Sequence, residues 1–300
     1  MGTLVTIHVV RPDPEACAAI DRAFGWFQAI EARCTRFVRD SELMQLTARP
    51  GVPVPASAIL FEAVRFALRV AEESGGAFDP TVGHRMEARG FNREHRTLEA
   101  IHTALASGDH VTWRDVELDP DQRTITLLRP LTLDLGAVAK GLAVDAAARE
   151  LEPFRDFALD AGGDLYMGGL NHRGRPWSVG IRHPRREGES IAWMRVSNQA
   201  VCTSGDYERR IPGSAADQRY LNSGGPEHHI LDPRTGASPH AVASATVVAP
   251  GAMLADALAT AAFVLGPAEG IRFLDRMGVE GLIFTPELAR YATRGLCHVA

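Results

Sequence analysis

The sequence predicts an α+β fold in which helices and strands follow one another irregularly. Residues 58–74 place Leu60, Val64 and Ala67 on one face, which is the spacing of an amphipathic helix. Residues 243–249 are instead rich in β-branched and small apolar side chains, which indicates a buried strand. The chain shows neither the regular strand–helix alternation of a doubly wound sheet nor internal repeats. We therefore expect mixed sheets with packed helices.

The N-terminal half predicts two long helices and several short elements. Residues 3–10 alternate as in a strand, and helical spacing follows over residues 15–33. Ser41 is placed to cap a short helix, and the helix over residues 58–74 ends at two glycines. Two further elements are expected in this half: a candidate helix over residues 97–107 and a hairpin over residues 116–128.

The C-terminal half begins with the stretch from Leu131 to Asp145. Its first residues favour an extended strand, Gly136 permits a turn, and an Ala-rich helix then runs to about residue 151. The strands expected after it cover residues 157–169 around a glycine bend, 177–182, 191–196, a segment from 200, 243–249 and 281–284. The helices expected after it run from Pro250 to about residue 265 and over residues 267–277. No interdomain linker is recognisable, so we expect one domain over residues 1–300, with or without a small helical subdomain around residues 15–110.

A strand that turns at glycine into a helix exposes free backbone N–H groups and the positive end of the helix dipole. Both features favour an anion, and Lys140 in the first turn adds a full charge. The alternative interpretation is an ordinary strand–helix joint from which Lys140 reaches water. The stretch matches neither a Walker A loop nor a Gly-x-Gly-x-x-Gly motif, so by itself it is a weak indication of a phosphate site.

Charge and composition exclude several classes of protein. The net charge of −5 gives no reason to expect nucleic-acid binding, and no apolar run approaches the length of a membrane helix. The 4 cysteines are scattered without zinc-binding spacing. We expect no nucleic-acid partner and no membrane insertion. The chain as given carries no export signal, so we expect a cytoplasmic location, or a periplasmic one if a signal was trimmed.

The helix after Pro250 is almost entirely apolar, with Asp256 and Thr260 as polar exceptions four residues apart on one face. A carboxylate among apolar neighbours is unfavourable unless it is paired or binds a metal. A carboxylate and a hydroxyl on adjacent turns suit a hard cation such as Mg²⁺. The alternative is a carboxylate stabilised by the helix dipole and a threonine bonded to its own backbone.

Four ordered motifs together resemble the ApbE family: Asp134-Leu-Gly-Ala-Val-Ala-Lys-Gly141, Ser204-Gly-Asp-Tyr-Glu-Arg209, His229-Ile-Leu-Asp-Pro-Arg-Thr-Gly236 and Ala255-Asp-Ala-Leu-Ala-Thr-Ala261. Met1-Gly-Thr3, Phe78-Asp-Pro-Thr-Val-Gly83 and Ala161-Gly-Gly-Asp164 extend the match over essentially the whole chain. The resemblance implies largely antiparallel sheets with packed helices in a T-fold-related architecture. It also implies an FAD:protein FMN transferase, which uses Mg²⁺ to move FMN from FAD to a threonine of an acceptor flavoprotein and releases AMP.

The resemblance also assigns roles to residues. Asp256, Thr260 and the carbonyl of Ala137 match the metal ligands, and Lys140 matches a lysine near the FAD phosphates. His229 is our candidate for the base that accepts the proton of the attacking hydroxyl; a histidine bonding a turn is the alternative. With Lys140 and His229, the residues expected to contact FAD are Thr3, Phe37, Asp79, Gly163, Asp164, Ser204, Gly205, Tyr207, Arg209 and Arg234.

Some of these assignments have structural alternatives, and the chain departs from the family pattern in places. Asp79 sits in a proline turn where it can bond local backbone, and Arg234 can fix its own loop by a salt bridge. After Gly83 relatives often continue with Pro-Leu, whereas this chain has His84-Arg-Met, which affects the flavin end and acceptor docking. Two other functions share the same site: an FAD pyrophosphatase that yields FMN and AMP, and a non-catalytic FAD-binding protein.

Overall fold

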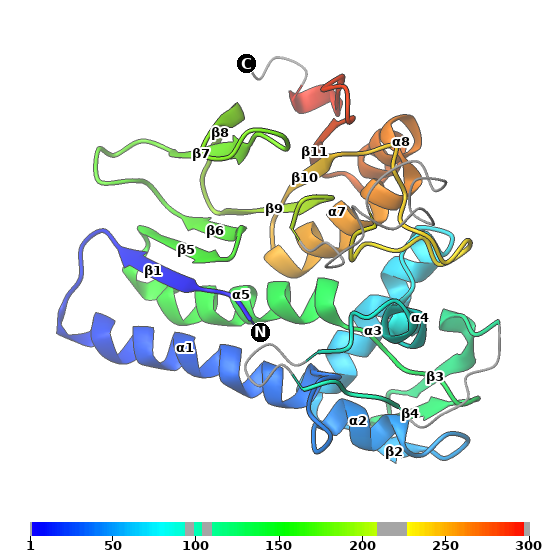
Figure 1. The fold of residues 1–300 in the computed structure, drawn as a ribbon. Helices are drawn as coiled ribbons and strands as arrows, with labels where there is room; N and C mark the ends of the chain where they lie inside the picture. Colours follow the sequence, from blue (N-terminus) through cyan, green and yellow to red (C-terminus); the bar gives the residue numbers. More distant parts are fainter. Residues whose placement is uncertain (1, 94–98, 104–109, 209–226, 297–300) are drawn as a thin grey trace.

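The computed structural model describes residues 2–93, 99–103, 110–208 and 227–296. Within these residues the largest element is a 7-stranded sheet with the order β1-β5-β6-β9-β10-β11-β12, in which each strand is antiparallel to its neighbours (Figure 1). Its strands are β1 (Val5–Val9), β5 (Phe157–Ala161), β6 (Asp164–Gly168), β9 (Gln199–Gly205), β10 (Ser244–Ala249), β11 (Glu280–Phe284) and β12 (Arg290–Ala292). The N-terminal strand therefore lies at one edge, paired with a strand about half the chain away.

Helices cover one face of this sheet. α5 (Gly136–Leu151) and α7 (Ala252–Leu265) lie against the strands, and α1 (Pro14–Cys34) and α3 (Ala58–Glu73) pack outside α5 (Figure 1). α8 (Pro267–Met277) lies beside α7 and β11. α5 and α7 are Ala-rich and buried on most sides, and their small side chains let two helices and a sheet approach closely.

A two-stranded hairpin covers the opposite face of the sheet. β7 (Trp177–Arg182) and β8 (Ser190–Val196) bury Val179 and Met194 against Leu282 and Phe284 of β11. Alternate residues of β11 point to opposite faces, so Ile283 belongs to the core on the helical side. The central strands are thus apolar on both faces.

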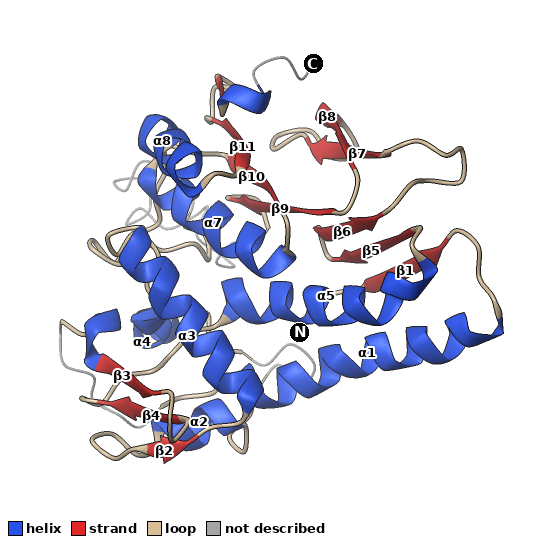
Figure 2. Ribbon diagram, turned by 180° about the vertical axis from the view of Figure 1, so that it is seen from behind, coloured by secondary structure: helices blue, strands red, loops and turns tan. Residues whose placement is uncertain are grey.

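A second, 3-stranded sheet lies away from the large one, below α3 in Figure 2. It consists of β2 (Val54–Pro55), β4 (Thr124–Leu127) and β3 (Val116–Asp119), and it lies near α2 (Glu42–Thr47). α4 (Gly83–Ala88) follows a short 3₁₀ turn at Pro80–Val82. No helix in the described part of the chain is long and apolar enough to cross a bilayer.

The structure confirms the α+β class and most of the expected elements. The hairpin over residues 116–128 forms as β3 and β4. Ser41 caps α2 by accepting a hydrogen bond from the amide of Met44 at 3.1 Å. The helices over residues 15–33 and 58–74 are α1 and α3.

The strand expected over residues 131–135 is wrong. No neighbouring strand pairs with the segment in the described structure. Its backbone instead bonds to the turn before α4: the amide of Asp134 donates to the carbonyl of Pro80 at 2.7 Å, and that of Gly83 donates to the carbonyl of Thr132 at 3.1 Å. A Cβ on Gly83 would lie 2.5 Å from that Thr132 oxygen, so only glycine allows this approach. An apolar run of leucines fits a buried connection as well as a buried strand.

The candidate helix over residues 97–107 is also wrong where it can be checked. Residues 99–103 are not helical, and Ala100 instead forms an isolated bridge with Arg93. The amide of Ile101 donates to the carbonyl of Asn92 at 2.8 Å, so this short piece bonds to another segment rather than to itself. The rest of that candidate helix lies outside the described residues.

Candidate functional site

Three charged side chains from three elements meet between α5, α7 and the sheet. Lys140 of α5 places its Nζ 2.6 Å from Oδ2 of Asp164, the first residue of β6. Asp256 of α7 is close enough that its charge and that of Asp164 act on Lys140. Burial alone would lower the pKa of Lys140, but these two carboxylates raise it above its usual value. We call Lys140, Asp164 and Asp256 the charged cluster; it brings two carboxyl groups and one ammonium together.

Asp256 is the residue of this cluster for which burial matters most. It is 6% exposed, and burial raises its pKa well above the usual value, with a further rise from Asp164 and an opposing effect of Lys140. Its Oδ2 is buried and has no hydrogen-bond partner among the described residues. A buried carboxylate oxygen in this state is free to accept a cation.

The surroundings of Asp256 supply further oxygen atoms. Thr260, one turn along α7, has its Oγ1 3.1 Å from Oγ of Ser204 on β9. Ala137 is the second residue of α5 and lies about one turn before Lys140. Carboxylate, hydroxyl and carbonyl oxygens are the donors that Mg²⁺ prefers. No group of three His, Cys, Asp or Glu side chains forms a metal cage in the described part of the chain, and the expected ligand set, with one carboxylate, does not require one.

The start of α5 is not the open anion site that the sequence predicted. The amide of Gly136 donates to Oδ1 of Asp134 at 2.8 Å, and the amides of Val138 and Ala139 donate to the carbonyl of Leu135. A carboxylate of the chain thus takes the place in which a bound anion was expected. Positive charge at this site comes from the Lys140 side chain rather than from free helix amides.

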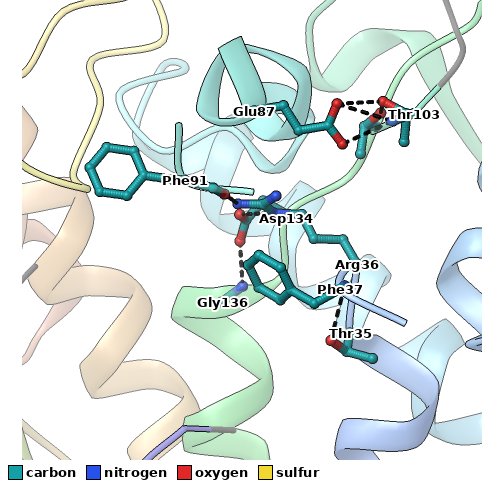
Figure 3. A network of polar contacts seen from close by, with 9 residues as sticks. Thr35, Arg36, Phe37, Glu87, Phe91, Thr103, Asp134 and Gly136 are labelled. Carbon is teal, nitrogen blue, oxygen red and sulfur yellow. Dashed lines mark hydrogen bonds and ion pairs between the residues drawn. The ribbon is translucent and has the colours of Figure 1, made fainter. Parts of the chain in front are cut away.

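Asp134 also joins α5 to the segment after α1 (Figure 3). Its Oδ2 lies 2.6 Å from Nε of Arg36, which is 4% exposed and also donates to the carbonyl of Phe91. The guanidinium carbon of Arg36 lies 4.3 Å from the centre of the Phe37 ring. This cation–π contact holds Phe37, the expected flavin contact, close to the first turn of α5.

Thr3 lies next to the glycine bend at residues 162–163, although the two are far apart in the chain. Gly162 and Gly163 form the two-residue turn between β5 and β6 with φ of 63° and 94°, a geometry that favours glycine. A Cβ on Gly162 would lie 1.8 Å from Oγ1 of Thr3, so the two residues are packed in direct contact. Asp164 follows at once, which connects Thr3 to the charged cluster.

The end of β9 and the turn after it contain Ser204, Gly205 and Tyr207. Tyr207 folds back over Gly205, where a Cβ would lie 2.6 Å from the tyrosine ring. Arg182 of β7 stacks on the same ring at 5.0 Å, and burial raises the pKa of Tyr207 to about 12. Its hydroxyl is therefore neutral at physiological pH. Arg209, also expected to contact FAD, lies outside the described residues.

His229 lies in a segment that is bonded to Arg85 of α4 and to Arg89, the residue that follows α4. Arg85 of α4 donates to the carbonyl of Pro233. Arg89 donates to the carbonyl of Gly236 at 2.8 Å and to Oγ of Ser238 at 2.9 Å. Arg89 also pairs with Glu227, so the same arginine contacts the chain on both sides of His229.

Arg234 and Asp79, two of the expected FAD contacts, bond to other groups of the protein, as their alternative interpretations proposed. Arg234 is exposed and bonds twice to Asp232, two residues earlier, at 2.9 Å. Asp79 caps the turn before α4: its Oδ1 accepts from the amide of Thr81 at 2.9 Å, and its Oδ2 accepts from the amide of Trp113 at 3.0 Å. Burial raises the pKa of Asp79, whereas these hydrogen bonds lower it.

Sequence reasoning missed three charged residues around the site, namely Arg36, Arg89 and Asp145. Arg36 precedes the aromatic residue that was singled out, and Asp145 ends the organising stretch, so both were visible beside known motifs. The hydrogen-bond partners of the three residues are between 55 and 149 residues away in the chain, and no local pattern predicts such pairs.

Solved structures from two bacteria share this fold. The ApbE protein from Thermotoga maritima superposes with a TM-score of 0.83 at 28% sequence identity, covering 98% of this chain and 95% of that one. The flavin transferase ApbE from Vibrio cholerae gives a TM-score of 0.79 at 25% identity, covering 100% and 96%. The architecture is thus that of the ApbE flavin transferases.

The sequence comparisons identify the family directly. The ApbE family model matches residues 1–283, and the chain belongs to this family. A relative in Treponema pallidum, named FAD:protein FMN transferase, is 33% identical over 99% of this chain and 85% of its own length. One in Haemophilus influenzae with the same name is 31% identical over 82% and 72%. The expected resemblance, and with it the expectation of an enzyme, is confirmed.

Proposed function

We propose that this chain transfers FMN from FAD to a threonine hydroxyl of an acceptor flavoprotein, with Mg²⁺, and releases AMP. The observation that carries the proposal is the charged cluster beside the hydroxyls of Ser204 and Thr260. It combines two carboxyl groups and a buried Asp256 oxygen that has no hydrogen-bond partner among the described residues, which suit a divalent cation, with an ammonium that suits a phosphate.

The site residues have separate roles in the proposed reaction. Asp256, Thr260 and the carbonyl of Ala137 would hold the metal, which when bound neutralises charge on phosphate oxygens. Lys140 turns from Asp164 toward the pyrophosphate and stabilises the negative charge that develops there. Its side chain is half-buried, so the charge acts with little screening by water.

The covalent step is an in-line displacement at the phosphorus of the FMN half. The threonine oxygen forms the new P–O bond, and the bond from this phosphorus to the bridging oxygen breaks, so AMP leaves with that oxygen. His229 accepts the threonine proton in our proposal, a contribution of about 10²–10⁴ in rate. His229→Ala is expected to slow single turnover while FAD binding persists, because a base acts mainly in the transition state.

Incubation with FAD, Mg²⁺ and a candidate acceptor flavoprotein tests the function. Covalent FMN on the acceptor with one AMP per attached flavin supports the proposal. Free FMN with AMP, whether or not acceptor is present, would show an FAD pyrophosphatase instead. Intact bound FAD would show a binding protein without chemistry. An acceptor in which the target threonine is replaced by valine is the matched control.

A further inference from the structure

α7 begins without a cap of its own. Its N-cap residue is Gly251, which has no side chain to accept a hydrogen bond from the first free amides. Asp145 of α5 takes this role from another helix: its Oδ1 accepts from the amide of Ala252 at 2.6 Å and its Oδ2 from the amide of Met253 at 3.0 Å. One carboxylate thus satisfies two amides of a helix more than 100 residues away in the chain.

The two helices also touch most closely at this point. Gly141 lies one turn before Asp145, and a Cβ there would lie 2.5 Å from both the carbonyl oxygen of Ala252 and the Cα of Met253. A Cβ on Gly251 would lie 2.9 Å from Oδ2 of Asp145. Neither helix can slide or rotate here without a clash or the loss of a hydrogen bond, and Figure 1 shows α7 starting beside α5.

The proposed metal site spans these same two helices. α5 contributes Ala137 and Lys140, one to two turns before Asp145, and α7 contributes Asp256 and Thr260, one to two turns after the capped amides. The relative position of the two pairs therefore depends on how α7 is fixed to α5. Asp145 makes the only side-chain hydrogen bonds to the first two amides of α7 among the described residues.

We infer that Asp145 is a positioning residue that fixes α7 against α5, so that Asp256 and Thr260 stand at the right distance from Ala137 and Lys140 to bind a divalent cation. The inference rests on the proposed metal-dependent function. Substitution of groups that orient metal ligands lowers metal affinity by about 10–100-fold, and we expect a loss in this range when Asp145 is changed.

The test measures Mn²⁺ affinity of the full chain by calorimetry, with no FAD present, together with thermal unfolding. Asp145→Asn keeps the size of the side chain but offers one acceptor oxygen and an NH₂ group that faces an amide. Asp145→Glu keeps the charge and both oxygens but is one methylene longer, so it displaces α7. If Asp145 acts by position, both variants lose affinity.

A matched cap elsewhere gives the control. Asp13 caps α1 by accepting from the amides of Glu15 and Ala16 at 2.9 and 3.0 Å. Asp13→Ala removes this cap and is expected to lower the unfolding temperature without changing Mn²⁺ affinity. A loss of Mn²⁺ affinity in this control would show that affinity follows global stability and would overturn the inference.

The remaining outcomes are distinct. Weak binding by Asp145→Asn with normal binding by Asp145→Glu would show that only the charge of Asp145 matters, and positioning would be wrong. Normal binding by Asp145→Asn would also overturn the inference and leave the proposed function intact. If the unsubstituted protein does not bind Mn²⁺, the metal dependence in the proposed function fails, and this inference fails with it.

Discussion

His228 makes the stability of this protein sensitive to mild acid. Its side chain is 1% exposed and packs edge-on against the rings of Phe263 at 5.5 Å and His240 at 6.0 Å. Nε2 lies 3.0 Å from the carbonyl of Pro239, and because a carbonyl only accepts, Nε2 carries the proton. Burial lowers the pKa of His228 from 6.5 to about 4, so the folded protein keeps this ring neutral.

The size of the effect follows from proton linkage. The unfolded chain takes up a proton at His228 near pH 6.5, whereas the folded chain does so only near pH 4. Its contribution to stability is therefore complete above pH 6.5, falls as the pH drops from 6.5 to about 4, and then levels off. At pH 4.5 the calculated loss is about 2.5 kcal/mol, a large part of the stability of a typical domain.

Urea denaturation of the protein and of His228→Gln at pH 7.5 and pH 4.5 measures this loss. Glutamine stays neutral at both pH values, so the variant should lose about 2.5 kcal/mol less on acidification than the unsubstituted protein. Other titrating groups contribute to both proteins and cancel in the comparison. His172→Gln, the same change at an exposed histidine, is the control substitution. The same acid sensitivity in His228→Gln and the unsubstituted protein would refute the reasoning.

Substitutions at Asp256, Gly141 and Arg36 test the metal site, the contact between α5 and α7, and the buried ion pair. Asp256→Asn should abolish Mn²⁺ binding seen by calorimetry without lowering the unfolding temperature, because it removes a buried charge; tight Mn²⁺ binding by this variant would place the metal elsewhere. Gly141→Ala should destabilise the protein by about 2 kcal/mol in urea denaturation, because its Cβ meets the backbone of α7. Gly25→Ala in α1, which has open space around it, should stabilise the protein by about 0.5–1 kcal/mol. Equal effects of the two substitutions would contradict the close contact between α5 and α7. Arg36→Met should destabilise the protein by about 3 kcal/mol, because it removes the ion pair between Arg36 and Asp134. Arg36→Lys should recover part of this loss. Full stability of Arg36→Met would show that the ion pair contributes little.

Local physics was enough to predict most of the fold. The apolar face of residues 58–74, the Ser41 cap and the hairpin around Asp119 are each decided by neighbours within a few residues, and each appears in the structure. The segment at residues 131–135 was misassigned because its leucines are as suited to a buried connection as to a strand. Its partners, the backbone groups of Pro80 and Gly83, are distant in the sequence.

The candidate site was predictable as a list of residues but not as an arrangement. Motifs named Lys140, Asp164 and Asp256, and the structure places them together. The occupied start of α5 could not be foreseen, because a helix N-terminus looks free until its cap is known, and Asp134 faces inward to serve both Gly136 and Arg36.

The position of β1 at the sheet edge has a consequence for how the protein is made. β1 leaves the ribosome well before its partner β5, which follows only after almost 150 further residues. At a synthesis rate of about 5–20 residues per second, this strand waits roughly 10–30 s without its pair. Thr6 and His8 on its outer face are polar and exposed, which discourages pairing with other chains in that interval. The charged cluster closes later still, when α7 emerges and brings Asp256 to Lys140 and Asp164.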